Sequence, residues 1–445
     1  MKAKGGAGVL SEAELDRLQR NAFAYFLHET HAGSGLVRDS THDGSPSSIA
    51  AVGLALTAYP VGVMRGFMDR DEAAARTLTT LRFLTNAQEG EERDATSHRG
   101  FFYHFLDMGS GRRAWDCELS TIDTAYLMAG ALSAAAYFDG EEREERDIRE
   151  TADALYRRCD FTWALNGGLL LSHGWKPEGG FLKHSWTGYS EALVLYLLAL
   201  GSPTHPIPPE SYAAFTSSYL FRKLYGIEYL HAAPLFIHQL SHVWVDFRGI
   251  RDAPMRACGL DYFENSARAT RVQRLYAIRN PRHFAGYGEN CWGITSSEGP
   301  GPATLDVGGV TRRFYDYVAR GVPNGPDDGT LAPWAVVASI PFAPEIAMPA
   351  IAHMHAIGVG QGPYGFEATF NPTFPTESKD PCGWVSPRNF GLNDGPILLM
   401  VENHRTGFLW DLMRRCPYLV RGLNAAGFRG GWLRRKAGAR RAARG

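Results

Sequence analysis

The chain has 445 residues, of which 44% are hydrophobic and 12% are aromatic. Its 46 Lys and Arg residues nearly balance its 47 Asp and Glu residues, so the net charge of −1 gives no reason to expect a nucleic-acid partner. No apolar run is long enough for a membrane-spanning helix, and the composition is typical of a globular protein that buries a large core.

Both ends of the chain are expected to lie outside the folded core. Residues 1–9 are Gly-rich and predict a flexible N-terminus, while 431–445 predict a basic, solvated C-terminal tail rather than a specific anion site. Residues 1–10 lack the apolar core of a secretory signal, so the sequence as written predicts a cytoplasmic protein, or a periplasmic one if the N-terminus was clipped or processed. The six cysteines form no CxxC pair and are expected to be free, buried thiols.

Hydrophobic spacing predicts a succession of helices in which buried ones alternate with amphipathic ones. Strand signals are few and short, with a short hairpin expected near 101–105, and Pro and Gly concentrate in the loops. Ser11-Glu12-Ala13-Glu14 predicts the cap of the first helix. The helices are expected, in chain order, at 11–30, 47–64, 71–87, 120–137, 141–158, 191–200, 209–219, 253–277, 344–357 and 394–415.

This alternation predicts an all-α fold, and the simplest arrangement is an (α/α)6 toroid with inner buried helices, outer amphipathic helices and the long loops at one end. We expect one catalytic domain over 10–430. An α-solenoid and a protein with two helical domains are the alternatives. No repeat of fixed period and no linker is visible in the sequence, which disfavours the solenoid.

Three of the buried helices follow loops that carry acidic and aromatic side chains, at 115–130, 186–200 and 390–401. The loops therefore lie at the positive ends of the helix dipoles, and they meet if the helices run parallel. Two carboxyl groups on either side of a glycosidic bond are what its hydrolysis needs: one donates a proton, and the other activates water or attacks. The catalytic candidates are Glu191, Asp123, Glu118 and Asp394.

Three of these acids also have a structural interpretation. Glu191 and Asp123 fit capping positions, and Asp394 fits an N-cap with Pro396 in the first turn. The helix dipole would lower the pKa of Glu191, so a role as general acid requires burial or a neighbouring carboxylate to raise it. Glu118 precedes the cap at Ser120, where no structural role is evident.

Many Trp and Tyr residues lie in polar loops, where they can stack on the apolar face of a sugar ring, although most aromatic side chains simply pack in a core. The loops 286–299 and 362–366 are expected to contact substrate, with plain Gly-rich turns as the alternative. The substrate-binding candidates are Asp39, Trp115, Asp116, Trp186, Tyr189, Glu289, Trp292, Glu298 and Tyr364.

Neither a metal nor a cofactor is expected. His238 and His242 are spaced i, i+4 on an expected helix, but the Glu of the HExxH motif is missing, so hydrogen-bonded structural histidines are favoured over zinc ligands. The Gly-rich stretch 358–362 does not follow a strand, which argues against a dinucleotide site.

The sequence also resembles the bacterial glucoamylase-like family, which includes the β-1,2-glucanases of glycoside hydrolase family 144. The resemblance covers roughly 10–418. It implies an (α/α)6 toroid without a metal that hydrolyses β-1,2-linked glucose chains with inversion of the anomeric centre. Glu191 and Asp123 match acids that the family uses as catalytic or essential groups, and Glu118 lies in the same motif. The matching stretches are 101–107, 117–124, 188–192, 241–248, 261–266, 286–293, 339–345 and 402–407.

The chain departs from the family pattern at one acid. The family often has Asp-Gln-Gly-Pro where this chain has Asn393-Asp394-Gly395-Pro396, so either Asp394 takes over the role or the base comes from elsewhere. Glu298 likewise stands where the family leads us to expect Asp. The expected activity is cleavage of β-1,2-glucan into sophorose or longer oligosaccharides. The alternatives are a transglycosylase, a hydrolase of another β-glucan, or a non-catalytic glucan-binding protein that has lost its base.

Overall fold

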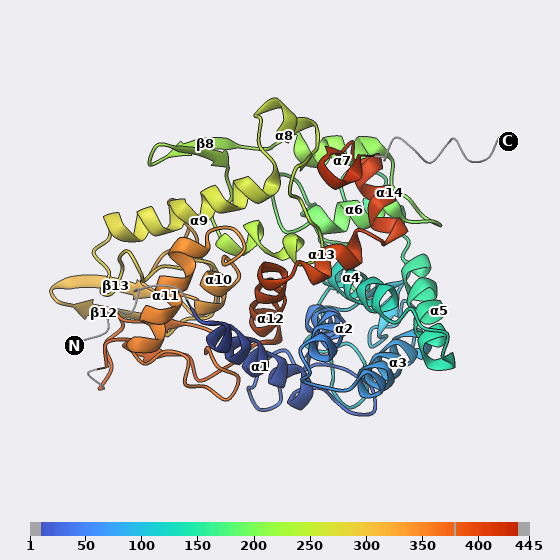
Figure 1. Ribbon diagram of the computed structural model, residues 1–445, viewed down its shortest axis with the longest axis horizontal. Coiled ribbons are helices and arrows are strands. Elements are labelled where there is room, and N and C mark those ends of the chain that lie inside the picture. The colour runs from blue at the N-terminus through green and yellow to red at the C-terminus, as the bar shows by residue number, and fades with distance from the viewer. Residues whose placement is uncertain (1–9, 378–379, 435–445) are drawn as a thin grey trace.

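The computed structural model describes residues 10–377 and 380–434 (Figure 1). The expectations for 1–9, and for the basic tail beyond residue 434, lie outside the described residues. The helices are α1 (Glu12–His28), α2 (Ile49–Met64), α3 (Arg70–Asn86), α4 (Thr121–Tyr137), α5 (Arg143–Arg158), α6 (Leu193–Gly201), α7 (Pro209–Thr216), α8 (Ala253–Ala257), α9 (Tyr262–Arg279), α10 (Pro333–Val337), α11 (Pro344–Ala356), α12 (Gly391–Arg405), α13 (Phe408–Met413) and α14 (Pro417–Ala425). Short 3₁₀ segments are η1 (Trp163–Leu165), η2 (Leu235–His238), η3 (Leu240–Val243) and η4 (Gly431–Leu433).

The strands are short and pair in small antiparallel sets. They are β1 (Ser47–Ser48), β2 (Ser97–His98), β3 (Phe101–Phe102), β4 (Phe105–Leu106), β5 (Leu119–Ser120), β6 (Gly174–Lys176), β7 (Gly180–Phe181), β8 (Phe221–Leu224), β9 (Ile227–Leu230), β10 (Ile250–Arg251), β11 (Ser296–Ser297), β12 (Ala303–Val307), β13 (Val310–Phe314), β14 (Val318–Ala319), β15 (Phe370–Asn371), β16 (Trp384–Val385) and β17 (Arg429–Gly430). The prediction of a mostly helical fold is confirmed. The hairpin expected near 101–105 lies earlier in the chain, because β3 pairs with β2 over 97–102 while β4 pairs with β1.

The helices begin where side chains can accept the first free backbone N–H groups. Ser11 and Glu14 form the predicted capping box of α1. Ser48 caps α2 and Ser120 caps α4 in the same way, each accepting from the backbone N–H three residues on. Because both helices are almost entirely apolar, burial on all sides follows.

The buried helices contact one another in succession. α12 packs against α2, α2 against α4, and α4 against α6, while α12 also contacts α10 and η3. A second set lies outside them: α1 contacts α12, α3 contacts α2, α5 contacts α4, and α14 contacts α6. Figure 1 shows α12 near the centre of the molecule, with α2 and α4 on one side and α10 on the other.

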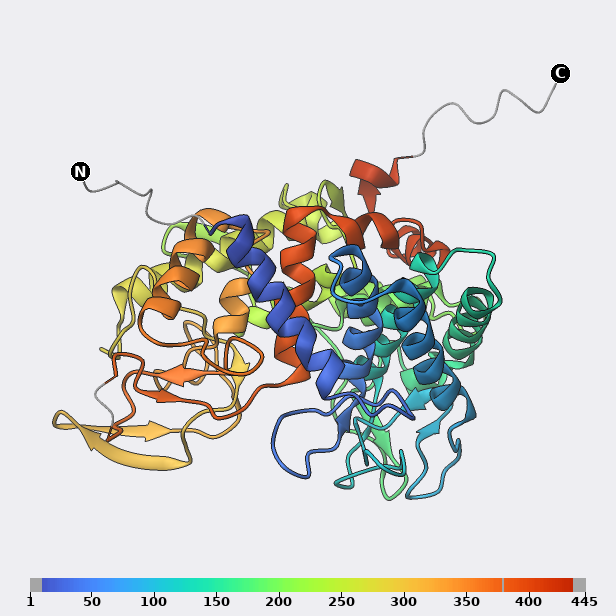
Figure 2. The same ribbon diagram turned by 60° about the horizontal axis from the view of Figure 1, so that its bottom comes forward.

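The long loops before α2 and α4 lie at one end of the molecule, at the bottom of Figure 2. They are tied together there because β1, just before α2, pairs with β4 in the loop before α4. β5, at the start of α4, pairs in turn with β6. These short pairings fix the polar loops over the N-terminal ends of the buried helices.

Three expectations are corrected by the structure. The helix expected at 253–277 is two helices, because Gly259 takes a positive φ of 74° and Asp261 caps a new start. The helix expected at 394–415 begins at Gly391, ends at Arg405, and is followed by α13 and α14. His238 and His242 lie on separate 3₁₀ segments rather than on one helix.

The expectation for the cysteines is confirmed in part, since all six are free but Cys258 is exposed. Within the described residues, no helix is both long enough and apolar enough to cross a membrane.

Two buried helices of the core, α2 and α4, contact each other closely through glycine. A Cβ on Gly130 would lie 2.0 Å from the carbonyl oxygen of Gly53, and a Cβ on Gly53 would lie 2.4 Å from that of Tyr126. Both obstructing atoms belong to the backbone, which cannot rotate away. The absence of side chains at these two positions therefore sets the spacing of the two helices.

We expect Gly130→Ala to destabilise the fold. Overpacking of a core typically costs about 1–3 kcal/mol, which outweighs the roughly 1 kcal/mol that Ala gains in helix propensity. Urea unfolding followed by circular dichroism measures the difference. Gly179→Ala is the matched control, since a Cβ there meets nothing within 4 Å. Equal stabilities of the two variants would contradict the proposed helix spacing.

Candidate active site

A cavity of about 300 Å³ is lined by loops that are far apart in the sequence. Asp39 comes from the loop between α1 and α2, His104 from the loop between α3 and α4, and Asn393 from the first turn of α12. Ser297 and Glu298 come from β11 and the residue after it. The cavity therefore collects polar side chains from the same end of several buried helices.

The rest of the cavity wall is aromatic and aliphatic. Such walls, with a few polar groups placed among them, are typical of small-molecule sites. The rings can stack on the flat apolar face of a sugar while the polar groups bind its hydroxyls. These lining side chains are Phe105, Phe236, Leu240, Tyr317, Trp334, Phe390 and Leu392.

His104 joins the carboxyl groups at this site. Its Nδ1 lies 2.9 Å from Oε1 of Glu118, and its Nε2 lies 3.6 Å from Oδ2 of Asp123. Its main-chain N–H donates to the carbonyl oxygen of Glu118 at 2.9 Å, and its ring stacks on Phe105 with the centroids 4.0 Å apart. We refer to His104, Glu118, Asp123 and Asp39 as the His104 cluster.

The charges of the His104 cluster depend on one another. Burial lowers the pKa of His104, but Asp123, Glu118 and Asp39 together raise it to about 9, so the ring is an imidazolium at neutral pH. Burial raises the pKa of Glu118, but the hydrogen bond and charge of His104 bring it below its usual value. The cluster thus contains a half-buried cation that holds the pKa of Glu118 below its usual value.

Asp123 lies in the first turn of α4, and its carboxylate faces His104. The cap itself is Ser120, whose hydroxyl accepts from the backbone N–H of Asp123 at 3.2 Å and donates to Oδ2 of Asp123 at 2.5 Å. The carboxylate of Asp123 is therefore held by a hydroxyl on one side and an imidazolium on the other.

Glu191 lies on the turn that leads into α6, two residues before the helix begins. The residue is half-buried, and burial followed by the charge of Asp123 raises the pKa of its carboxyl to about 7, although a backbone hydrogen bond lowers it. The burial that an acid role requires is therefore present, and it outweighs the hydrogen bond at the helix start.

Glu191 does not line the cavity, but its charge acts on Tyr317, which does. Tyr317 has 68% of its surface exposed. The pKa of Tyr317 is raised, first by desolvation and then by the charges of Glu191, Asp39 and Asp123. The charges of all three carboxyl groups therefore act on one tyrosine of the cavity wall.

Asp39 is half-buried, and its side chain faces the cavity. Burial and the charge of Asp123 raise the pKa of its carboxyl to about 6, against the opposing effect of His104. The backbone of Asp39 is fixed on both sides, because its N–H donates to Pro46 and its carbonyl accepts from Gly391 at the start of α12.

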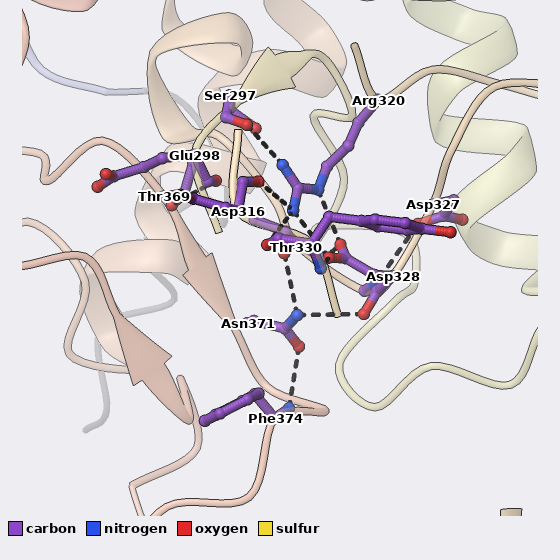
Figure 3. Close-up of polar contacts among 12 residues, drawn as sticks. Ser297, Glu298, Asp316, Arg320, Asp327, Asp328, Thr330, Thr369, Asn371 and Phe374 are labelled. Carbon is purple, nitrogen blue, oxygen red and sulfur yellow. Dashed lines mark hydrogen bonds and ion pairs between the residues drawn. The ribbon is translucent and has the colours of Figure 1, made fainter. Parts of the chain in front are cut away.

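A buried ion pair supports the part of the cavity wall that carries Ser297 and Glu298 (Figure 3). Arg320 and Asp328 have fully buried side chains that meet at 2.7 Å. Arg320 also donates to the carbonyl oxygen of Ser297 at 2.5 Å, and β11 pairs with β14 beside Tyr317. Breaking a buried pair of this kind typically costs about 3–5 kcal/mol, so this contact fixes the wall that carries Ser297 and Glu298.

Glu298 lines the cavity, but both of its carboxylate oxygens are engaged. The Ser386 hydroxyl donates to Oε1, and Arg388 lies 3.2 Å from Oε2. Burial nevertheless raises the pKa of Glu298. Its backbone carbonyl accepts from Thr369, so main chain and side chain are both held (Figure 3).

The first turn of α12 presents Asn393, and not Asp394, to the cavity. Asp394 is 1% exposed, and neither of its carboxyl oxygens has a hydrogen-bond partner among the described residues. Burial raises the pKa of Asp394 well above its usual value. Asp394 therefore does not line the cavity that holds Asp39 and His104, contrary to its expected pairing as the second carboxylate.

Several other predicted residues lie away from the cavity. Asp116 forms an exposed ion pair with Arg93, and Glu289 pairs with Arg274 at the surface. Trp292 is fully buried in the core, and the hydroxyl of Tyr364 donates to Glu29 at 2.7 Å.

Three aromatic candidates lie close to the site without lining the cavity. Trp186 is 9% exposed and donates through Nε1 to Thr121 in the first turn of α4 at 3.0 Å. Tyr189, also nearly buried, packs on Tyr262. Trp115 is 66% exposed, and its ring lies 5.0 Å from that of Phe105, which lines the cavity.

Sequence reasoning missed His104, Tyr317 and Asn393. His104 belongs to the conspicuous stretch 101–107, and its main-chain contact with Glu118 follows from the strand pairings around β4. A prediction that α12 begins at Gly391 would have identified Asn393. Asn393 and Asp394 are then consecutive helical residues, so their side chains point to different faces of the helix. No sequence signal distinguishes Tyr317 from other loop tyrosines.

No group of three or more His, Cys, Asp or Glu side chains among the described residues could hold a metal ion. Burial lowers the pKa of His238 and of His242 to about 3, so both rings are neutral. His238 hydrogen-bonds the carbonyl of Ala232, and His242 hydrogen-bonds the hydroxyl of Ser266.

Comparisons with known proteins find a family model and a relative of known name that are similar to this chain. Residues 183–417 match the Glycoamylase family model, described as "Putative glucoamylase". The chain is 28% identical, over 93% of its length, to an exo β-1,2-glucooligosaccharide sophorohydrolase (non-reducing end) of Parabacteroides distasonis. It spans 58% of the length of that relative.

Solved structures are similar over nearly the whole chain. A Bacteroides uniformis protein, described in the same words as the family, has a TM-score of 0.84 and 29% identity, covering 96% of this chain and 99% of that one. The endo-β-1,2-glucanase of Chitinophaga pinensis, solved with sophorotriose and glucose, has a TM-score of 0.81 and 27% identity, covering 95% and 99% of the two chains.

We expect His104→Gln to lower stability in a pH-dependent way. The raised pKa of His104 means that its charge stabilises the fold fully below its unfolded pKa of about 6.5, provided Glu118 and Asp123 are ionised, and this contribution disappears as pH rises through about 9. Urea unfolding at pH 6 and pH 10 compares the variant with the wild type. A loss that is equal at both pH values would show that the imidazolium charge does not stabilise the cluster.

Proposed function

The chain belongs to the Glycoamylase family, and from that premise we propose that it is a glycoside hydrolase that cleaves β-1,2-linked glucan into short oligosaccharides. Support comes from two relatives of similar sequence, one named as a sophorohydrolase and one as an endo-β-1,2-glucanase. The resemblance extends over more than nine-tenths of this chain in both cases.

The observation that carries this proposal is the place of Glu191, which is half-buried on the turn into α6, where burial and the charge of Asp123 raise the pKa of its carboxyl to about 7. A general acid must be protonated when the substrate binds and must lose its proton in the transition state, which requires a pKa near the working pH. An ordinary glutamate would be ionised at neutral pH. Glu191 therefore suits the role of proton donor to the glycosidic oxygen.

The His104 cluster supplies the opposing charge in this proposal. An oxocarbenium-like transition state carries positive charge at the anomeric carbon, and the negatively charged oxygens of Glu118 can stabilise such charge through space. The hydrogen bond and charge of His104 hold the pKa of Glu118 below its usual value. The aromatic wall that includes Phe105, Trp334 and Phe390 can hold glucose rings against these groups.

We propose further that the helices form the (α/α)6 toroid implied by the family resemblance, as one catalytic domain over residues 10–430. The succession of contacts from α12 through α2 and α4 to α6 supports an inner ring. The contacts of α1, α3, α5 and α14 with those helices support an outer one.

We expect Glu191→Gln to abolish turnover while leaving the fold intact. Gln keeps the size and most hydrogen bonding of Glu but has no acidic proton, and general acid catalysis typically contributes about 10²–10⁴-fold. Initial rates of reducing-sugar release, with thermal unfolding as a check of the fold, measure the effect. A variant that is less stable but keeps near-normal turnover would make Glu191 a helix cap.

We expect β-1,2-glucan to yield short oligosaccharides whose new reducing ends are initially α-anomers. Inverting hydrolysis places water between two carboxyl groups roughly 6.5–9.5 Å apart, whereas retention needs them at roughly 5–5.5 Å. Proton NMR in the first minutes reads the anomer before mutarotation, and chromatography identifies the products. An initial β-anomer would indicate a retaining enzyme, and no product from β-glucans would favour a binding protein.

A further inference from the structure

We propose that Asp39 is the base that activates the hydrolytic water. This assignment rests on the proposed glycoside hydrolase function. It names the catalytic base, which the sequence leaves open. The polar residue that α12 presents to the cavity is Asn393, whose neutral amide cannot accept a proton from water, so we look for the base on another element. Asp39 lies on the loop between α1 and α2, and its carbonyl oxygen accepts a hydrogen bond from Gly391 at the start of α12.

The other carboxyl groups near the cavity either have hydrogen-bond or ion-pair partners or do not line the cavity. Glu118 and Asp123 both contact His104, and Glu298 is engaged by Ser386 and Arg388. Asp394 does not line the cavity and is almost fully buried.

Asp39 differs from all of these acids. Within 10–377 and 380–434, its carboxylate forms no hydrogen bond or ion pair, although it is half-buried and faces the cavity. Its main chain is nonetheless fixed, by a 2.7 Å bond to Pro46 and a 3.0 Å bond from Gly391. A carboxylate that is held in place but has free oxygens can accept a proton from water.

The charged surroundings of Asp39 match this role. His104 and Asp123 are the charged groups that act on it, and Tyr25 and Tyr317 are the titratable groups that sense its charge. A pKa of about 6 leaves the carboxylate ionised at neutral pH and more basic than an ordinary aspartate. With Glu191 at about 7, the two groups are oppositely protonated between these values.

In the hydrolysis step, Asp39 accepts one proton and Glu191 donates one. The carboxylate of Asp39 takes a proton from water while the water oxygen forms a bond to the anomeric carbon. The bond from that carbon to the glycosidic oxygen breaks, and its electron pair stays on the leaving oxygen, which takes the proton of Glu191. Asp39 ends protonated and Glu191 ends ionised, and exchange with solvent restores both.

The test compares Asp39→Asn with Asp43→Asn in full-length enzyme acting on β-1,2-glucan. Asp43 lies in the same loop and is exposed, so its variant keeps wild-type rates. We expect Asp39→Asn to lose about 10²–10⁴-fold in kcat with KM little changed. The wild type should gain kcat/KM as pH rises through about 6, and this rise should be absent in the variant.

Chemical rescue separates a missing base from a damaged fold. Azide can replace the activated water because it attacks the anomeric carbon without losing a proton. Asp39→Asn with azide should therefore form an α-glycosyl azide at a raised rate, which requires a folded site and an intact Glu191. Full activity of Asp39→Asn, or an inactive variant that azide does not rescue, overturns the assignment alone. A wild type that releases no sugar contradicts the proposed function, and the assignment with it.

Discussion

An imidazolium surrounded by carboxylates decides which acids at this end of the molecule carry charge. His104 contacts Glu118 and Asp123 and acts on Asp39 through space. Without a cation among them, several carboxyl groups in one desolvated region would repel each other and take up protons. His104 lowers the pKa of Glu118, so Glu118 stays ionised. Glu191 makes no direct contact with His104, and its pKa is about 7. The pKa values of the two glutamates therefore differ. Separation of this kind is how one site holds an acid and a base at the same pH.

The fold delivers these groups because several buried helices begin at the same end. Glycine contacts bring α2 and α4 together closely, and the pairing of β1 with β4 places His104 over the start of both. The buried Arg320–Asp328 pair holds the part of the cavity wall that carries Ser297 and Glu298. The site is thus attached to rigid elements through short strands and buried polar contacts, although the side chains themselves lie on loops.

Much of the helical framework could be predicted from the sequence. Capping serines and apolar periodicity located α1, α2 and α4 within a few residues, since both signals are local. The meeting of polar loops at one end followed from the alternation of buried and amphipathic helices. Glu191, Asp123, Glu118 and Asp39 were chosen as acids in those loops, and they gather around His104 and Tyr317.

The site predictions that were wrong or missing concern residues whose role depends on three-dimensional context. A helix start at Gly391 instead of Asp394 turns Asn393 toward the cavity and Asp394 away from it, and a boundary shift of that size is beyond a local pattern. Asp116 and Glu289 have surface arginine partners that are distant in the sequence. His104 has no motif of its own, because its importance comes from carboxylates on other segments.

The central claim is that Glu191 keeps its proton near neutral pH while Glu118, which His104 contacts, does not. The most direct measurement is a pH titration of side-chain carboxyl carbons by NMR, in wild-type protein labelled at Glu and in the Glu191→Gln variant. The account predicts one Glu resonance that titrates near pH 7 in the wild type and is absent from the variant. If the resonance lost on substitution titrates at the ordinary value for glutamate, about 4.3, Glu191 is ionised at neutral pH and the account is contradicted.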